Sequence, residues 1–115
     1  YGLSQKLELF KKAGCSLNSI TAVGGGTKSR FWMQVISDIC GIKQRIPEVT
    51  VGASYGDAIL AGLGIGAIKS TKEIKSWIKT KYVTIPNNEL EEVYKKYKKL
   101  YSDLYLKNKE IMHSL

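Results

Sequence analysis

The first third of the chain alternates between helical and extended patterns of apolar residues. Residues 3–13 repeat apolar side chains at i, i+4 and i+7 with charged residues between them, which predicts an amphipathic helix. The β-branched run 19–23 predicts a short strand, which three consecutive glycines end. Residues 30–40 return to helical spacing, with Ser29 placed to cap the helix and Gly41 placed to end it. This order predicts a strand–turn–helix unit.

The middle of the chain adds a second strand and a helix of unusual composition. Residues 42–46 set apolar ends around a polar centre, and we expect a strand there. The segment from Ser54 to Asp57 has the spacing of a capping box, which predicts a helix over 55–67. That helix contains several glycines, each of which costs about 1 kcal/mol relative to alanine. We therefore expect another backbone to approach this helix closely.

The last third predicts a short helix, an extended segment and a long helix. Thr71 is placed to cap the short helix, and residues 82–86 are predicted to be extended. Residues 88–112 form the long helix, whose apolar stripe we expect to face the core while its lysines mostly face away. The stripe consists of Leu90, Val93, Tyr94, Tyr97, Leu100, Tyr101, Leu104 and Tyr105. The whole pattern predicts an α/β chain that is rich in helix and has a small sheet.

Length and composition narrow the class of protein. A chain of 115 residues is one domain or part of one, and its 43% apolar and 24% charged residues are those of a globular protein. No run reaches the roughly 18 apolar residues of a membrane span, and no signal-peptide pattern opens the chain. The chain opens directly in a helical pattern at Tyr1, which predicts a fragment or a processed product.

Cysteine and histidine content predicts neither disulfides nor zinc. Cys15 and Cys40 are the two cysteines, and we expect both to be buried, reduced thiols of a cytoplasmic protein. A single histidine, His113, gives no basis for a zinc site. Trp32 shares a helical face with other apolar residues, so we expect it in the core rather than at a ligand.

The net charge and the small size of the sheet indicate which partners the chain could bind. The formal net charge of +8 raises nucleic acid as a partner, and much of the excess lies on the helix 88–112 among tyrosines. Tyrosines that share a face with leucines are usually core residues, so we expect no nucleic-acid partner. A protein-interaction module is the other alternative. Because a small sheet leaves strand edges open to another chain, we expect copies of the chain to associate.

The glycine-rich segment ITAVGGGTKSRFW, residues 20–32, is the strongest candidate for a binding site. Glycine lets the backbone approach a ligand closely, and the start of the following helix offers free N–H groups that suit phosphate. The segment lacks the glycine spacing of a Walker A loop. It also lacks a Rossmann GxGxxG, because Ser29 stands at the last glycine position. A tight strand-to-helix connection without a ligand explains the same pattern equally well.

Two blocks of residues together resemble the FGGY carbohydrate kinases. The first is GGGTKSRFW at 24–32, continuing to Gly41, and the second is GASYGDAILA at 52–61. Their order, spacing and residue types match the GGGxKS turn and the later GAAxLAxxG-type helix of that family's C-terminal domain. The sequence GGGTKS is most similar to that of the xylulokinase branch. One departure is Gly56-Asp57, where many members have two small residues.

The resemblance implies an actin-like ATPase fold, with two RNase H-like domains around a cleft. Residues 1–115 would be the C-terminal portion of the second, ATP-binding domain. The glycine turn would lie against ATP, with Gly25 and Gly26 making backbone contacts, and helix 55–67 would pack behind it. The candidate nucleotide contacts are Gly24, Gly25, Gly26, Lys28 and Ser29. The parent enzyme would use ATP and Mg²⁺ to phosphorylate a sugar hydroxyl. The similarity of the motif sequence to the xylulokinase branch makes D-xylulose the expected sugar.

The groups that perform phosphoryl transfer are expected outside this segment. In the family, the catalytic base is an aspartate of the first domain, where the sugar pocket also lies. Asp38, Asp57 and Asp103 are the aspartates here, and none belongs to a motif that resembles the catalytic one. We therefore expect the segment to lack the metal ligands and to have no kinase activity by itself. The alternative is a non-catalytic nucleotide-binding or protein-interaction domain.

Overall fold

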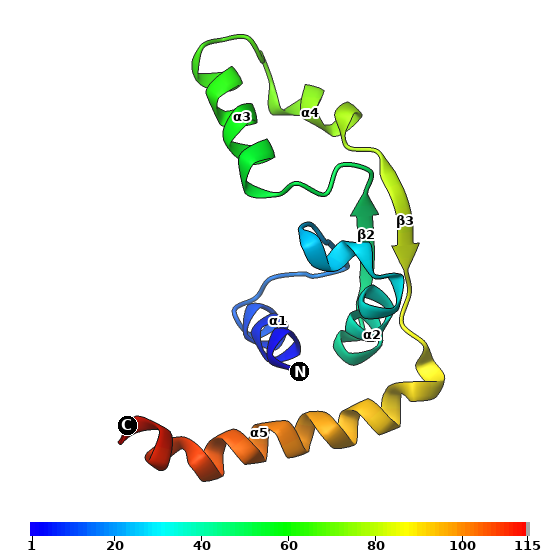
Figure 1. Cartoon of the computed structure of the whole chain (residues 1–115), viewed down its shortest axis with the longest axis vertical. Helices are drawn as coiled ribbons and strands as arrows, with labels where there is room; N and C mark the ends of the chain where they lie inside the picture. The colour runs from blue at the N-terminus through cyan, green and yellow to red at the C-terminus, as the bar shows by residue number, and fades with distance from the viewer. Residues whose placement is uncertain (115) are drawn as a thin grey trace.

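A computed structural model describes residues 1–114 and contains a three-stranded sheet near its centre (Figure 1). The strands are β1 (Ser19–Thr21), β2 (Lys43–Pro47) and β3 (Thr80–Thr84), in the order β1-β2-β3. β1 runs parallel to β2, and β3 runs antiparallel to β2. Residues 80–84 thus extend the sheet, where the sequence indicated only an extended segment over 82–86.

Residues 1–114 also form five α-helices, and two short 3₁₀ turns precede α2 and α5. The helices are α1 (Gly2–Lys12), α2 (Arg30–Cys40), α3 (Ala53–Gly64), α4 (Thr71–Trp77) and α5 (Glu91–His113). The 3₁₀ turns are η1 (Gly25–Lys28) and η2 (Asn88–Leu90). Figure 1 shows α3 and α4 at one end of the molecule and α5 along the other, with the sheet, α1 and α2 between them.

The limits of α2 agree with the sequence prediction. Ser29 is the N-cap, and its Oγ accepts a hydrogen bond from the Trp32 amide at 3.1 Å. Gly41 ends the helix in the left-handed conformation, at φ 60° and ψ 36°. The crossover from β1 through α2 to β2 forms a β–α–β unit, so the glycine turn lies at the strand-to-helix corner of that unit.

The apolar core is small and lies where α1, α2 and the beginning of β2 meet. Leu7, Cys40 and Ile42 are buried together. Partly buried apolar residues pack around this cluster, namely Leu17, Ile20 and Ile36. The prediction for Cys40 is confirmed, but Cys15 is exposed, because it follows the end of α1 in a loop.

A buried polar network joins α2 to the sheet. Gln44 is only 1% exposed, and its Nε2 donates to the Met33 carbonyl oxygen at 2.6 Å and to Ser37 Oγ at 2.9 Å. Ser37 Oγ in turn lies 2.7 Å from Thr84 Oγ1 on β3. The Gln44 side-chain amide is therefore buried with hydrogen-bond partners for its Nε2. These hydrogen bonds join α2, β2 and β3.

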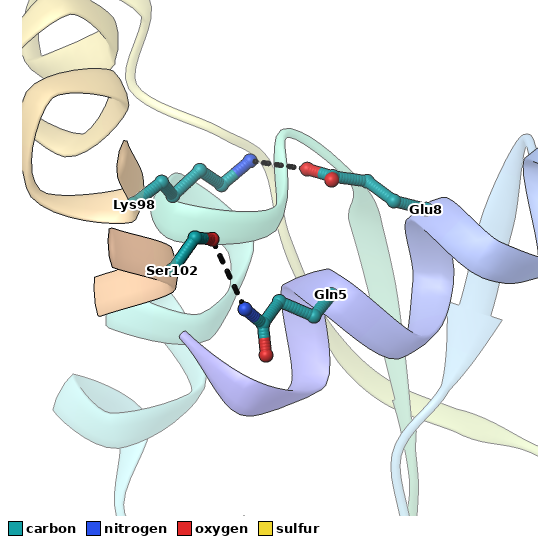
Figure 2. A network of polar contacts seen from close by, with 4 residues as sticks. All are labelled: Gln5, Glu8, Lys98 and Ser102. Atoms are coloured by element: carbon teal, nitrogen blue, oxygen red, sulfur yellow. Dashed lines mark hydrogen bonds and ion pairs between the residues drawn. The ribbon is translucent and has the colours of Figure 1, made fainter. Parts of the chain in front are cut away.

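Helix α5 meets α1 and its N-cap residue through two polar contacts and one aromatic pair, in which the ring centroids of Tyr1 and Tyr101 lie 5.7 Å apart. Gln5 Nε2 donates to Ser102 Oγ at 3.1 Å, and Lys98 Nζ lies 3.5 Å from Glu8 Oε1. Both contacts join α1 to α5 (Figure 2). The prediction that the tyrosine and leucine stripe faces the core is wrong in this structure. Tyr97 is 49% exposed and Leu104 62% exposed, because the face around Lys98 and Ser102 is turned toward α1.

Helix α3 differs from its prediction in two respects. It begins after Gly52, and no side chain caps it, so Ser54 lies inside the first turn and the predicted capping box is wrong. The predicted close approach of another backbone is also absent from residues 1–114. A Cβ placed on Gly56 or Gly64 would meet nothing within 4 Å, and only Gly62 is crowded, by the Ile68 side chain.

Two further expectations are corrected. Ser70, not Thr71, is the N-cap of α4, and its hydroxyl accepts from the Lys72 amide at 3.2 Å. Trp32 is 53% exposed rather than a core residue, and the neighbouring Met33, 3% exposed, is the buried residue of this turn. Within residues 1–114, no helix combines the length and the apolar character that crossing a membrane requires.

Candidate functional site

The candidate site is the turn from Gly24 to Ser29, between β1 and α2. Gly24 adopts φ 92° and ψ −175°, a conformation that side-chain-bearing residues rarely adopt. Its amide donates to the Thr50 carbonyl oxygen at 2.6 Å, which attaches the start of the turn to the loop after β2. Glycine at position 24 is therefore required by the backbone itself.

The middle of the turn is a single 3₁₀ turn that folds back on Gly24. Both the amide and the hydroxyl of Thr27 donate to the Gly24 carbonyl oxygen, at 3.2 and 2.6 Å. Thr27 is 6% exposed, so these two hydrogen bonds are shielded from water. The Ser29 amide closes the next turn by donating to the Gly26 carbonyl oxygen at 3.2 Å. These bonds fix the backbone on either side of Gly25 and Gly26.

The amides of Gly25 and Gly26 are the free donors of this turn. Among residues 1–114, neither donates to a backbone or side-chain acceptor, as expected for the first residues of a helical turn. A Cβ on Gly25 would meet nothing within 4 Å, and one on Gly26 would make only ordinary contact with Trp32 and Met33. The backbone is therefore open to a ligand at these two positions.

The two polar candidates flank the free amides. Lys28 is exposed at the end of η1, and its ammonium forms no ion pair within the described part of the chain. Ser29 uses its hydroxyl oxygen to accept from the Trp32 amide, which leaves the hydroxyl hydrogen available as a donor. The structure thus brings all five predicted residues, Gly24, Gly25, Gly26, Lys28 and Ser29, into one continuous turn.

Tyr82 was not predicted from the sequence, yet it contacts the turn. Its hydroxyl, on β3, donates to the Thr27 carbonyl oxygen at 3.0 Å. The Arg30 guanidinium lies over the Tyr82 ring, 4.7 Å from its centroid. Tyr82 is 55 positions from Thr27 in the sequence, and no local pattern marks it. Only the pairing of β3 with β2 brings it to the turn.

The carboxylates do not converge on the glycine turn. Asp38 is 9% exposed and its Oδ1 accepts from Gln34 Nε2 at 2.7 Å and from the Asn87 amide at 2.8 Å, so it holds α2 to the segment before α5. Asp57 and Asp103 lie on α3 and α5. Within residues 1–114, no three acidic, histidine or cysteine side chains gather as metal ligands do. None of the three aspartates belongs to the glycine turn, so the turn itself supplies no carboxylate to a Mg²⁺ ion.

An apolar cavity of about 330 Å³ lies beside the turn. It is bounded by Val23, the first turn of α3 and the end of α4, including Tyr55 and Trp77. Gly52 is close-packed there, because a Cβ on it would lie 3.0 Å from Val23 Cγ2. The cavity offers apolar surface and few polar groups, so it supplies packing rather than chemistry.

Comparison with known families assigns the chain. Residues 1–65 match the profile described as the FGGY family of carbohydrate kinases, C-terminal domain. A xylulose kinase of Staphylococcus epidermidis is 36% identical over 116 residues, covering 100% of this chain and 23% of that protein. The chain therefore belongs to the FGGY family of carbohydrate kinases.

Other relatives include a second xylulose kinase and a glycerol kinase. A xylulose kinase of Bacillus subtilis is 29% identical over 100% of this chain and 23% of its own length. A glycerol kinase of Saccharolobus islandicus is 42% identical over 77 residues, which is 67% of this chain and 15% of that protein. The chain thus spans less than a quarter of the length of these relatives.

Solved structures define the fold. The xylulose kinase from Rhodospirillum rubrum matches with a TM-score of 0.79 at 22% identity, covering 97% of this chain and 23% of that one. A gluconate kinase from Lactobacillus acidophilus matches with a TM-score of 0.72 at 23% identity, over 84% of this chain and 20% of that one. The fold is part of the actin-like ATPase fold of these kinases, helix-rich with a small sheet, as the sequence predicted.

Proposed function

We propose that this chain is the C-terminal portion of the second, ATP-binding domain of an FGGY kinase that phosphorylates a sugar hydroxyl. The glycine turn then lies against ATP, with the Gly25 and Gly26 amides as backbone donors and with Lys28 and Ser29 at the nucleotide's edge. The observation that carries this proposal is the pair of free amides on an open backbone. The parent enzyme is a cytoplasmic ATP-dependent carbohydrate kinase.

D-xylulose is the sugar we propose. Relatives named xylulose kinase align over 100% of this chain, whereas the glycerol kinase match covers 67%. The higher identity of that shorter match, 42%, makes glycerol the second candidate. Phosphorylation of D-xylulose and of glycerol, measured side by side with the full-length kinase, separates the two. Faster turnover of glycerol at saturating substrate would contradict the proposal.

The isolated segment is proposed to have no kinase activity. Phosphoryl transfer needs a base that orients the acceptor hydroxyl and a metal that spreads the developing charge. Asp38, the one aspartate near the sheet, is already engaged by Gln34 and Asn87. A coupled assay of residues 1–115 with ATP, Mg²⁺ and D-xylulose is expected to give no turnover above background, and measurable turnover would overturn this part of the proposal.

The test of the nucleotide site uses Gly25→Val in the full-length kinase. Gly25 is not among the glycines with positive φ, and its Cβ position is open, so the substitution is compatible with the fold. A side chain there covers the two free amides and is expected to weaken ATP binding at least tenfold, since each lost hydrogen bond to a charged group is worth about 1.5–3 kcal/mol. Gly24 is unsuitable for this test, because any side chain there is strained.

The matched control is Gly56→Val on α3. Gly56 also has an open Cβ position and no positive φ, but it lies outside the turn. ATP affinity, measured by calorimetry, is expected to be unchanged in this variant. Wild-type affinity in Gly25→Val would show that the turn does not contact the nucleotide, and the proposed site would be abandoned.

A further inference from the structure

We propose that Tyr82 is a positioning residue, which holds the Gly25 and Gly26 amides in the orientation that receives the nucleotide. This inference rests on the proposed function of the glycine turn. It assigns to β3, a strand outside the glycine-rich segment, a direct part in the shape of the site.

The glycine turn is attached to the rest of the molecule at two points on either side of the free amides. At its start, the Gly24 amide is bonded to the Thr50 carbonyl oxygen. After the two free amides, the Thr27 carbonyl oxygen accepts from the Tyr82 hydroxyl at 3.0 Å. Gly25 and Gly26 therefore lie between a backbone hydrogen bond at Gly24 and a side-chain hydrogen bond at Thr27. Without the second, the 3₁₀ turn could tilt about Gly24.

Tyr82 is itself held in place from two sides. Its backbone pairs with Ile46, which is 1% exposed in the central strand, so its Cα cannot shift without disturbing the sheet. The Arg30 guanidinium covers its ring at 4.7 Å. Arg30 is also the first residue of α2, directly after Ser29. The ring thus joins the last part of the turn, the start of α2 and β3 in one contact.

This arrangement is specific to the hydroxyl. A tyrosine needed only for packing would not require its oxygen to reach a main-chain carbonyl 55 positions away. The acceptor belongs to Thr27, which is 6% exposed and also bonds Gly24 through its hydroxyl and amide. Loss of the Tyr82 hydroxyl leaves that carbonyl without its side-chain donor while the ring, the strand pairing and the Arg30 contact remain.

The test is Tyr82→Phe in the full-length kinase. The KM for ATP is expected to rise about two- to tenfold, which corresponds to one net hydrogen bond. The kcat and the KM for the sugar are expected to change less than about twofold, because misplaced amides weaken ground-state and transition-state binding of the nucleotide alike. A general loss of structure would instead lower kcat and the melting temperature.

A matched control is Tyr94→Phe on α5. Tyr94 is half-buried, and its hydroxyl makes no hydrogen bond within residues 1–114. Its KM for ATP is expected to stay at the wild-type value. The second variant is Arg30→Gln, which removes the cation over the ring and is expected to raise the KM for ATP in the same direction by a smaller factor.

The outcomes separate this inference from the proposed function. A higher KM for ATP in both Gly25→Val and Tyr82→Phe supports both. A higher KM in Gly25→Val with a wild-type KM in Tyr82→Phe overturns the role of Tyr82 and leaves the nucleotide site standing. Wild-type ATP binding in Gly25→Val overturns the nucleotide site and this inference with it.

Discussion

Gln44 Nε2 donates to the Met33 carbonyl oxygen at 2.6 Å, which ties the buried centre of β2 to the first turn of α2. Met33 is the residue that follows Trp32 at the start of the helix, and its amide is bonded to the Ser29 carbonyl oxygen at 3.1 Å. The bond therefore reaches from the central strand to the cap that ends the glycine turn. A single amide side chain sets the distance between the sheet and the beginning of α2.

Replacement of Gln44 by leucine is expected to destabilise the protein. The change removes the hydrogen bonds that Gln44 Nε2 donates to the Met33 carbonyl oxygen and to the Ser37 and Thr84 hydroxyls, and each such bond contributes about 0.5–1.5 kcal/mol net. We expect a loss of roughly 2–4 kcal/mol in the free energy of unfolding, measured by urea denaturation. Lys43→Gln, on the exposed face of the same strand, is the control and should change it by less than about 0.5 kcal/mol. An equal effect of the two would refute the structural role of the network.

Gly41→Ala and Gly64→Ala are expected to have opposite effects on stability. Gly41 has φ 60°, so alanine there is expected to cost about 1 kcal/mol. Gly64 ends α3 with no positive φ and an open Cβ position, so alanine is expected to stabilise by about 0.5–1 kcal/mol. Urea titrations of both variants check this, and a gain in stability for Gly41→Ala would show that the helix ends differently.

The two cysteines are expected to differ in reactivity toward a thiol reagent. Cys15 is exposed and should react within the mixing time of a spectrophotometric assay with an aromatic disulfide. Cys40 is buried, and burial raises the pKa of its thiol, partly opposed by the nearby Lys98 ammonium. It should react only on unfolding. Two fast-reacting thiols in the native protein would contradict the buried core.

The same thiol makes a pH-dependent contribution to stability. Because the folded pKa of Cys40 is raised, the folded chain keeps this proton at higher pH than the unfolded chain does. The contribution is fully present below the ordinary value of 9.0 and is lost as the pH rises through the raised value. The difference in unfolding free energy between wild type and Cys40→Ala is expected to shrink above pH 9, and a difference that grows there would reverse the sign we assign.

The ion pair in Figure 2 is expected to contribute little. Lys98 and Glu8 are 3.5 Å apart with side chains 30% and 54% exposed, and exposed pairs are worth about 0–1 kcal/mol. Glu8→Gln should lower stability by no more than about 0.5 kcal/mol, and 1 M salt should remove that difference. A larger effect that persists in salt would mean that this contact anchors α5 to α1.

The sequence predicted best what is decided locally. Ser29 and Gly41 bound α2 as expected, because an N-cap hydroxyl and a left-handed glycine act within one turn of the helix. The five candidate residues of the glycine turn lie within six consecutive positions, 24–29, so their proximity was certain, while the freedom of the Gly25 and Gly26 amides required the structure. The capping box at Ser54 failed because Gly52 already starts that helix.

Features that depend on distant partners were not predictable. Gln44 lies in the polar centre of residues 42–46, and nothing in the local sequence shows that Ser37 and Thr84, 7 and 40 positions away, bond it in the interior. Tyr82 reaches the turn only through strand pairing. The stripe on α5 was assigned to the core from its spacing alone, but the face that carries Lys98 and Ser102 lies toward α1, while Tyr97 and Leu104 are exposed. Periodicity identifies a face, and tertiary contacts decide which face is turned inward.

Helix α3 has no buried residue and carries glycines whose Cβ positions are open. A helix of 12 residues without tertiary packing is near the length at which isolated helices are marginal in water. Its backbone bonds should therefore open far more often than those of β2, which has a neighbour on each side. In a hydrogen–deuterium exchange experiment on this chain, amide hydrogens of α3 should exchange first and those of β2 last.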